Sequence, residues 1–247
     1  QQRPAIAVVD IARERVTRLW SLAPLTGQDG GQLLLTPDGA TIFVVDRETQ
    51  VLVSFNPLTG ALGHRLDHVR TAALSADGAV LITANAVSLA AYSSQALTDA
   101  DNPAPLWRQD LARIDGLALN GDRVLVSRGG DPGQLQVFDA AEGRLLAKTA
   151  LPDAYLSGLA ALSDGGWAVR ANGSVAQVQR FSADLQQVIT TTVPSGSGLF
   201  FDASRNRLLL GGYRYDTQHA ASSQPVIQAL DASNLAVQTE QAWPNQE

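Results

Sequence analysis

Hydrophobic and polar residues follow one another along the chain in short blocks, and the block at 33–66 shows this pattern most clearly. It contains four segments, LLLT, TIFVV, VLVSF and ALGHRL, with a turn or polar break between neighbours. The first two segments are almost wholly apolar, which is typical of buried strands, and the last is more polar. Between the first two, Pro37 and Gly39 favour a tight turn, because proline presets φ and glycine accepts a positive φ. Two buried strands followed by two less buried ones indicate one blade of a radial sheet.

The same pattern returns along the chain, which indicates an internal repeat. The turn around Asp38 has counterparts at Asp77, Asp122, Asp164 and 202–206. These turns are spaced by roughly 40 residues, a period typical of four-stranded propeller blades. A second turn, which begins at Asn56 in the first block, has counterparts at Asp10, Asp139, Ser182 and Asp231. Side chains of this kind hydrogen-bond to the backbone two residues further on and so start turns.

The repeats predict a single all-β domain over residues 1–247. The fold class expected is a β-propeller of five to six four-stranded blades, with one blade incomplete in this chain. Its parts are an outer strand pair at 4–24 and repeat units at about 31–66, 70–111, 115–151, 157–193 and 197–243. The missing inner strands could come from residues outside this chain or from a partner, or the last blade could stay incomplete. We favour a sixth blade completed by residues outside this chain, because an open sheet edge invites aggregation.

Composition limits the classes of partner. The net charge is −6 and the pI is about 5.0, which argues against a nucleic-acid-binding protein, since such proteins need a basic face. No apolar run approaches the roughly 20 residues of a membrane-spanning helix. The chain has no Cys and no Met and begins QQRP, which indicates a processed protein or a fragment. Removal of a signal peptide is the preferred interpretation, and it predicts a periplasmic or otherwise exported bacterial protein.

Several segments carry a resemblance to a known repeat. LLLTPDGATIFVVDR at 33–47, AALSADGAVLITAN at 72–85 and LALNGDRVLVSR at 117–128 resemble the YVTN-type β-propeller repeats of bacteria, which are relatives of WD40 propellers. Weaker copies lie at 159–172 and 199–212. The resemblance implies a propeller and leaves the function open, because propellers of this kind include lactone hydrolases, subunits of quinone-dependent amine dehydrogenases, surface proteins and protein-binding scaffolds.

Arginine recurs at loops that a propeller would place on one face. In such a fold the loops into the first strand of each blade and those after the second strand lie around the same mouth. Positions of this kind are occupied by Arg47, Arg70, Asp115, Arg128, Arg170 and Arg214. Guanidinium groups clustered at a concave surface suit a carboxylate, a phosphate or an acidic peptide. The alternative is that each arginine pairs locally, as Arg47 could with Glu48, and such exposed pairs contribute only roughly 0–1 kcal/mol.

Other candidate chemistry is sparse. Tyr213 and Tyr215 flank Arg214 in a polar loop and could contact a ligand or partner through stacking and cation–π interactions. His64 and His68 would lie about 13 Å apart if both stood on one strand, too far for one metal ion. No catalytic residue, metal site or cofactor is therefore predicted.

These observations favour a binding or scaffold module of the bacterial cell envelope. It would recognise a partner protein or an anionic ligand on its arginine-rich face. The alternative is a propeller enzyme or enzyme subunit, either a lactonase-like hydrolase or part of a quinone-dependent dehydrogenase complex. In that case Asp115, with Arg70 and Arg113 nearby, would be the first candidates for acid–base or electrostatic roles.

Overall fold

The structure, a computed structural model, consists almost entirely of antiparallel β-strands. It describes residues 5–10, 12–21, 31–99, 103–130, 132–151, 155–173, 175–196, 198–215 and 223–242. The chain divides into two compact units, unit 1 at residues 1–111 and unit 2 at residues 112–247. The single domain expected from the sequence stays a prediction. Within the described residues, no helix is long and apolar enough to cross a membrane.

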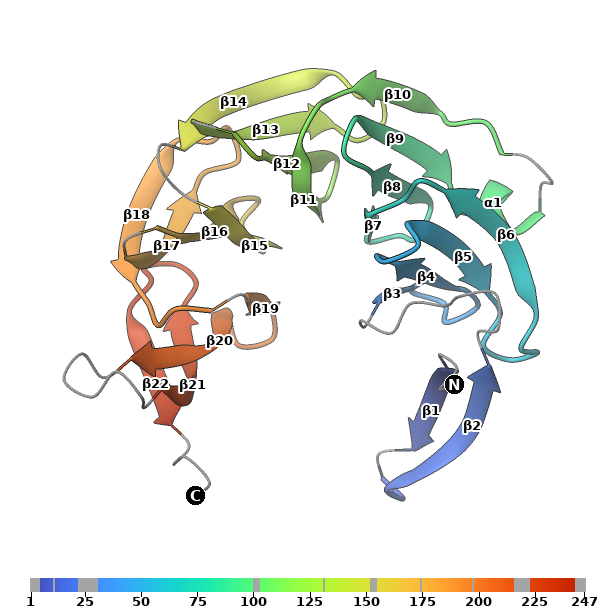
Figure 1. Ribbon diagram of the computed structural model, residues 1–247, viewed down its shortest axis with the longest axis horizontal. Coiled ribbons are helices and arrows are strands. Elements are labelled where there is room, and N and C mark those ends of the chain that lie inside the picture. Colours follow the sequence, from blue (N-terminus) through green and yellow to red (C-terminus); the bar gives the residue numbers. More distant parts are fainter. Residues whose placement is uncertain are drawn as a thin grey trace. The chain divides into compact units, whose positions relative to one another are not determined.

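Unit 1 contains one two-stranded and two four-stranded sheets (Figure 1). Sheet 1 comprises β1 (Ala5–Asp10) and β2 (Arg15–Ser21). Sheet 2 comprises β3 (Gln32–Leu35), β4 (Ile42–Asp46), β5 (Val51–Phe55) and β6 (Leu62–Asp67). Sheet 3 comprises β7 (Thr71–Leu74), β8 (Val80–Ala84), β9 (Ser88–Ser93) and β10 (Trp107–Asp110). The one-turn helix α1 (Ala96–Asp99) lies in the long connection between β9 and β10.

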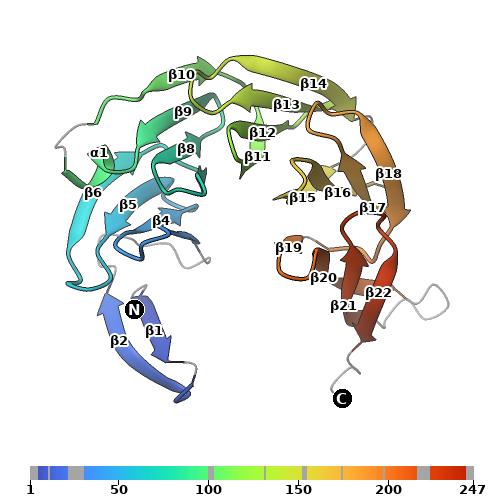
Figure 2. The same cartoon turned by 180° about the vertical axis from the view of Figure 1, so that it is seen from behind.

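Unit 2 contains three four-stranded sheets. Sheet 4 comprises β11 (Ile114–Asn120), β12 (Arg123–Arg128), β13 (Gly133–Asp139) and β14 (Leu145–Leu151). Sheet 5 comprises β15 (Tyr155–Ala161), β16 (Trp167–Asn172), β17 (Ala176–Phe181) and β18 (Gln187–Thr192). Sheet 6 comprises β19 (Phe200–Asp202), β20 (Arg207–Tyr215), β21 (Ser223–Asp231) and β22 (Val237–Ala242). In every four-stranded sheet the strands lie side by side in chain order, as both views show (Figures 1 and 2). The predicted set of four-stranded sheets with one incomplete member is confirmed.

Neighbouring sheets of a unit pack face to face through the side chains of their central strands. Val44 of β4 packs toward sheet 1 with Ile6, whereas its neighbour Val45 packs toward sheet 3 with Leu81. Unit 2 repeats the arrangement, with apolar clusters between sheets 4 and 5 and between sheets 5 and 6. Because successive residues of a strand point to opposite faces, a strand covered on both faces is apolar at most positions. This explains why the second strands are mostly apolar.

The expected burial of the strands needs a correction. β3 alternates between exposed and half-buried residues, although LLLT was predicted to be a buried strand. By contrast, all five residues of the third strand, β5, are buried. The reason is position in the sheet. β4 and β5 each have a strand on both sides, whereas β3 and β6 are edge strands.

Hairpin geometry identifies sheet 1 as the outer half of a four-stranded sheet. In sheets 2, 4, 5 and 6 the hairpin of the third and fourth strands has a β-bulge just before its turn. The β1–β2 hairpin has the same bulge, between Val8 and Val9. Each of these turns also contains one residue with positive φ, and these residues are Glu14, Gly60, Gly143, Leu185 and Leu235. The edge of β1 that would face a second strand therefore has no strand beside it among the described residues.

Candidate functional site

Three loops of unit 1 are joined into one surface by hydrogen bonds. They are the loop after β4 (46–50), the linker between β6 and β7 (67–70) and the loop after β8 (84–88), together called the loop surface below. The Val69 amide donates to the Gln50 carbonyl at 2.8 Å, and the Arg70 amide donates to the Ala84 carbonyl at 2.8 Å. The Asn85 Nδ2 donates to the His68 carbonyl at 2.9 Å. These bonds hold loops of two neighbouring sheets in fixed relation, as a recognition surface requires.

Arg47 and Arg70 are both exposed on this loop surface. Among the described residues, neither side chain has a hydrogen bond or ion pair, so the pair of Arg47 with Glu48 that the sequence allowed is not formed. The turn beside Arg47 is built by Asp46, whose carboxylate accepts from the amides of Glu48 and Thr49. Two guanidinium groups of the predicted set are thus available to a ligand.

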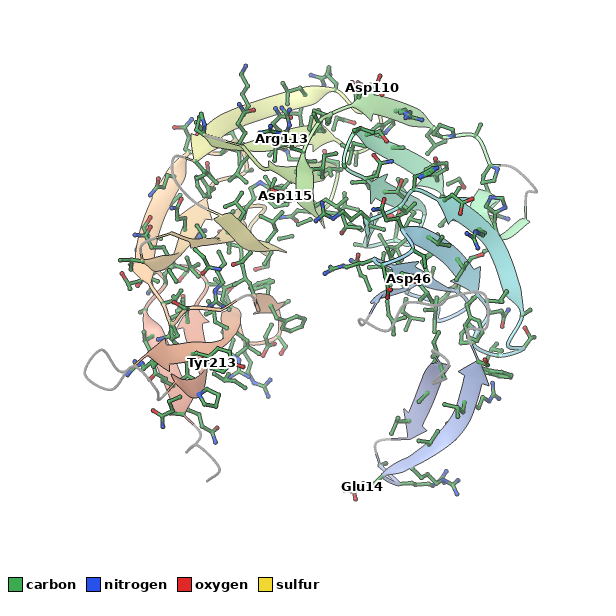
Figure 3. All side chains as sticks on the ribbon, in the orientation of Figure 1. Glu14, Asp46, Asp110, Arg113, Asp115 and Tyr213 are labelled. Carbon is green, nitrogen blue, oxygen red and sulfur yellow. The ribbon has the colours of Figure 1, made fainter. Side chains whose placement is uncertain are left out.

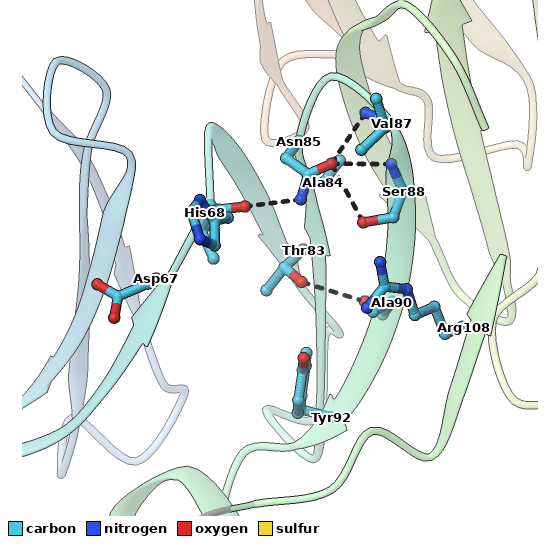
Figure 4. A pocket seen from close by; sticks show the side chains of 11 residues that line it. Asp67, His68, Thr83, Ala84, Asn85, Val87, Ser88, Ala90, Tyr92 and Arg108 are labelled. Carbon is cyan, nitrogen blue, oxygen red and sulfur yellow. Dashed lines mark hydrogen bonds between the residues drawn. The ribbon is translucent and has the colours of Figure 1, made fainter. Parts of the chain in front are cut away.

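A pocket of about 250 Å³ opens beside the loop surface, between sheets 2 and 3 (Figure 4). Its walls combine apolar side chains with groups that can hydrogen-bond or carry charge. The lining residues are Asp67, His68, Val69, Thr83, Ala84, Asn85, Val87, Ser88, Ala90, Tyr92 and Arg108. Arg108 comes from the edge strand β10, and its guanidinium lies 3.6 Å from the carboxylate of the highly exposed Asp110.

Tyr92 and His68 contribute to the pocket in different ways. Burial raises the pKa of the Tyr92 hydroxyl, and the positive charge of Arg108 partly opposes this shift. The hydroxyl therefore stays protonated at neutral pH and can donate a hydrogen bond. His68 has a φ of 61°, a left-handed conformation that is uncommon for a residue with a Cβ. The Asn85 bond to its carbonyl helps to hold this turn.

In unit 2, Asp115 and Arg128 lie at the same end of sheet 4. Asp115 is exposed at the start of β11, with its carboxylate against Gly129, and Arg113 precedes it on the same segment (Figure 3). Arg128 is the last residue of β12 and is half-buried. Its Nε donates to the Ala112 carbonyl at 2.9 Å, so part of its guanidinium fixes the chain entering β11. This is the role that Asn85 has toward His68 in sheet 3.

Arg170 does not lie in a loop, because β16 continues through Asn172. Its side chain is fully buried. The guanidinium donates to the carbonyls of Gly211 at 2.9 Å, Gly198 at 2.5 Å and Pro194. Burial lowers the pKa of Arg170. We therefore assign it to the joining of sheets 5 and 6 and leave it out of the candidate binding surface.

The remaining predicted residues lie on the long hairpin of sheet 6. Tyr213 is 49% exposed on β20 (Figure 3). Arg214 donates to Glu240 at 2.6 Å, so its charge is paired within the sheet. The backbone of Tyr215 pairs with Ser223, and its side chain lies outside the described residues. The predicted polar loop therefore begins as strand, and Tyr213 keeps its aromatic ring available for contact.

The pocket was missed by the sequence reasoning. Thr83, Tyr92 and Arg108 stand in ordinary strand patterns, and the deciding feature is the small Ala90 in β9. Residues at the equivalent third-strand position of the other four-stranded sheets are Val53, Gln136, Gln179 and Gln228. Aligning the repeats strand by strand would have shown this difference. For metal binding, the described residues contain no group of three or more His, Cys, Asp or Glu side chains.

Comparison with known proteins decides the fold. No family model and no curated protein matches the chain. Among solved structures, the chain is similar to Kuenenia stuttgartiensis hydrazine synthase, with a TM-score of 0.69 at 14% identity over 93% of this chain and 71% of that one. It is also similar to BamB from Moraxella catarrhalis, with a TM-score of 0.58 at 13% identity over 92% and 68%. The β-propeller domain of Cps50 (Swd1) from Myceliophteria thermophila gives 0.59 at 10% identity over 90% and 89%.

The fold is a β-propeller. Each four-stranded sheet is a blade of the propeller, and sheet 1 supplies the third and fourth strands of one further blade. The loop surface lies where the second strand of blade 2 and the first strand of blade 3 meet. Structural similarity at such low sequence identity establishes the fold alone, so the function must be argued from the site.

Proposed function

We propose that this chain is the recognition module of an exported bacterial protein built from YVTN-type propeller repeats. It binds a partner protein or ligand through a negatively charged group, and the loop surface of unit 1 is the contact region. The segments at 33–47 and 72–85, which carry the YVTN resemblance, end in two of the three loops of this surface. Tyr213 of unit 2 is a further candidate contact for a protein partner.

One observation carries the proposal. Arg47 and Arg70 stand exposed on loops fixed by backbone hydrogen bonds, and they have no side-chain partner among the described residues. The other arginines of the predicted set are engaged in the protein itself, Arg128 and Arg170 with carbonyls and Arg214 with Glu240. A hydrogen bond to a charged group contributes about 1.5–3 kcal/mol. Two guanidinium groups without a partner in the described part of the chain can therefore supply much of the affinity for an acidic ligand.

The test compares two double variants of equal net charge. The probe is a fluorescein-labelled peptide of four Glu-Ala repeats, and its binding is followed by fluorescence anisotropy at low ionic strength. Arg47→Gln with Arg70→Gln is expected to weaken binding by about tenfold or more. Arg144→Gln with Arg205→Gln is the control, because both residues are exposed in local ion pairs of unit 2. Equal weakening by the two double variants would overturn the proposal, since it would leave only a general charge effect.

A further inference from the structure

The pocket of unit 1 arises because blade 3 differs from the other blades in one row of paired residues, which runs across its second, third and fourth strands. In blade 3 this row pairs Thr83 with Ala90 and Ala90 with Arg108. The equivalent rows of the other blades are Val44–Val53–Arg65, Val126–Gln136–Lys148, Val169–Gln179–Thr190 and Leu210–Gln228–Glu240. Ala90 is the smallest residue at its position, so it leaves space between blades 2 and 3. Thr83 has nearly the volume of valine but places a hydroxyl in that space.

The groups around this space have donor capacity left for a ligand. The Thr83 hydroxyl reaches the Ala90 carbonyl only at 3.5 Å, the long limit for a hydrogen bond. Arg108 has a competing carboxylate in Asp110, but the Asp110 side chain is 91% exposed and such pairs contribute little. The hydroxyl of Tyr92 faces the same pocket, and His68, which is part of the loop surface, also lines it (Figure 4). Three different donors thus surround one cavity.

The other polar side chains of the wall have partners in the protein, since Asp67 pairs with Arg65 at 2.8 Å and the Ser88 hydroxyl donates to Asn85. The remaining wall is apolar and limits the size of the ligand. Val69, Ala84, Val87 and Ala90 offer methyl groups but no side-chain hydrogen-bond donor. The volume of about 250 Å³ lies below the roughly 300–1,000 Å³ typical of drug-sized ligands. A phosphate is usually held by several cations or by a set of backbone amides, whereas this pocket has one guanidinium, the carboxylate of Asp67 and several apolar side chains. A small group with one charged end and an apolar remainder fits it best.

We propose that this pocket binds a carboxylate on a short aliphatic stem, with the carboxylate at Arg108 and hydrogen bonds from Tyr92 and Thr83. The inference rests on the proposed function, and it specifies which negatively charged group is recognised beside the loop surface. The same chemistry occurs in a free short-chain acid and in a glutamate side chain of a partner. Arg47 and Arg70, which belong to the loop surface and do not line the pocket, would contact only the larger ligand.

The experiment uses the whole chain and three probes. Butyrate, its neutral analogue butyramide and the peptide acetyl-Ala-Glu-Ala-amide are titrated into ¹⁵N-labelled protein, and amide shifts are followed. We expect butyrate to saturate shifts at 67–69, 83–92 and 108 with a Kd of about 1 mM or tighter, and butyramide to leave them unchanged. Absence of saturable butyrate and peptide shifts at these residues would overturn the inference. If the peptide binds tenfold more tightly than butyrate, and its affinity also depends on Arg47 and Arg70, the natural ligand is a glutamate side chain of a partner protein. If the two affinities are equal, the natural ligand is a free short-chain acid.

Two variants test the assigned residues. Ala90→Gln fills the cavity with the residue that blades 4, 5 and 6 carry at this position, so the fold should accept it. Arg108→Gln keeps a polar, hydrogen-bonding side chain while removing its charge. Each should raise the butyrate Kd by about tenfold or more, whereas Arg144→Gln should not change it. If both variants bind butyrate as the unmodified protein does, the pocket is not its site.

The outcomes separate this inference from the proposed function. Loss of acidic-peptide binding in the Arg47/Arg70 double variant, with no effect of Ala90→Gln or Arg108→Gln, would retain the loop surface and reject the pocket. Butyrate binding that depends on Arg108, with no effect of the Arg47/Arg70 double variant on the acidic peptide, would retain the pocket and reject the surface.

Discussion

At the scale of single residues, the same side-chain type serves different purposes according to its register. Arg170 stands inside a strand and reaches into the space between two blades, where it bonds three carbonyls. Arg47 follows the end of a strand and stays exposed. One residue of register in a strand reverses the face to which a side chain points. The arginines therefore divide into structural and available ones by position, although their sequence contexts look alike.

Arg170→Ala is expected to be strongly destabilising. Removing the guanidinium leaves buried carbonyls without donors, and each unsatisfied group costs about 1–3 kcal/mol. We expect a loss of about 3–5 kcal/mol in the free energy of unfolding, measured by urea denaturation. The free energy of unfolding of Arg170→Lys should lie between those of the unmodified protein and Arg170→Ala, because an ammonium cannot reproduce the fork of donors of a guanidinium. The exposed Arg144→Ala should change stability by less than about 0.5 kcal/mol, and an equally small effect for Arg170→Ala would refute the structural role.

The turn aspartates predict the direction of the acid response. Asp38 and Asp77 each accept a hydrogen bond from a Thr or Ser two residues earlier, at 2.6 Å, and this lowers the pKa of both carboxyls from 3.8. Since the unfolded chain then binds more protons, this contribution is present above pH 3.8 and is lost as the pH falls through the lower folded values. Ser75→Ala should flatten the fall in thermal unfolding temperature between about pH 5 and 2. Ser163→Ala, exposed beside a turn aspartate, should leave that slope unchanged. A Ser75→Ala slope as steep as the unmodified one would contradict the assignment.

At the scale of elements, the hairpin of the third and fourth strands is the feature that recurs from sheet to sheet. Its bulge and its positive-φ residue occur in sheet 1 as in four of the complete blades. The turn of blade 2 also contributes to packing between sheets. The Trp20 ring of sheet 1 meets Phe55 edge-on at 6.1 Å and covers Gly60. The β5–β6 hairpin of blade 2, which has the same bulge and turn as the β1–β2 hairpin, therefore anchors sheet 1.

Gly60→Ala separates backbone strain from packing. Gly60 has a φ of 78°, and a Cβ there would lie 2.3 Å from the Trp20 ring. Gly39 has a φ of 69°, but a Cβ there would meet no atom within 4 Å. Both changes carry the cost of a left-handed alanine, about 1–2 kcal/mol. Gly60→Ala should cost about 2 kcal/mol more than Gly39→Ala in denaturant unfolding, because Trp20 must move. Equal costs would show that Trp20 does not pack as described.

The open edge of β1 has a measurable consequence. Ala5, Ala7 and Val9 are exposed in β1, whereas every residue of the equivalent strand β5 is buried. Amide hydrogens on an unpaired edge exchange with solvent faster than those of a central strand. Hydrogen–deuterium exchange should therefore label β1 well before β5 and β13. Equal protection would mean that another strand pairs with β1 in solution, and this edge is where the completing strands expected from the sequence would bind.

At the scale of the whole molecule, the repeat could be predicted and the site only in part. The turns at Asp38 and Asp77 and the apolar second strands predict the number and order of strands, because these features are local. The burial of β3 and the strand position of Arg170 could not be predicted, since they depend on which strands are edges and on where each strand ends. The pocket depends on Ala90 relative to Gln136 and Gln179, which is a comparison between blades. Arg47 and Arg70 could be chosen as candidates, but the sequence could not separate them from the arginines engaged inside the protein.

We propose above that unit 1 recognises an acidic group at the loop surface. The most direct test is a map of amide shifts while the peptide of four Glu-Ala repeats is added to the ¹⁵N-labelled chain. The largest shifts should fall at 46–50, 67–70 and 84–88, and they should weaken as salt screens the guanidinium charges. Largest shifts around Asp115 or Arg214 in unit 2, with the loops of unit 1 unchanged, would contradict the proposal.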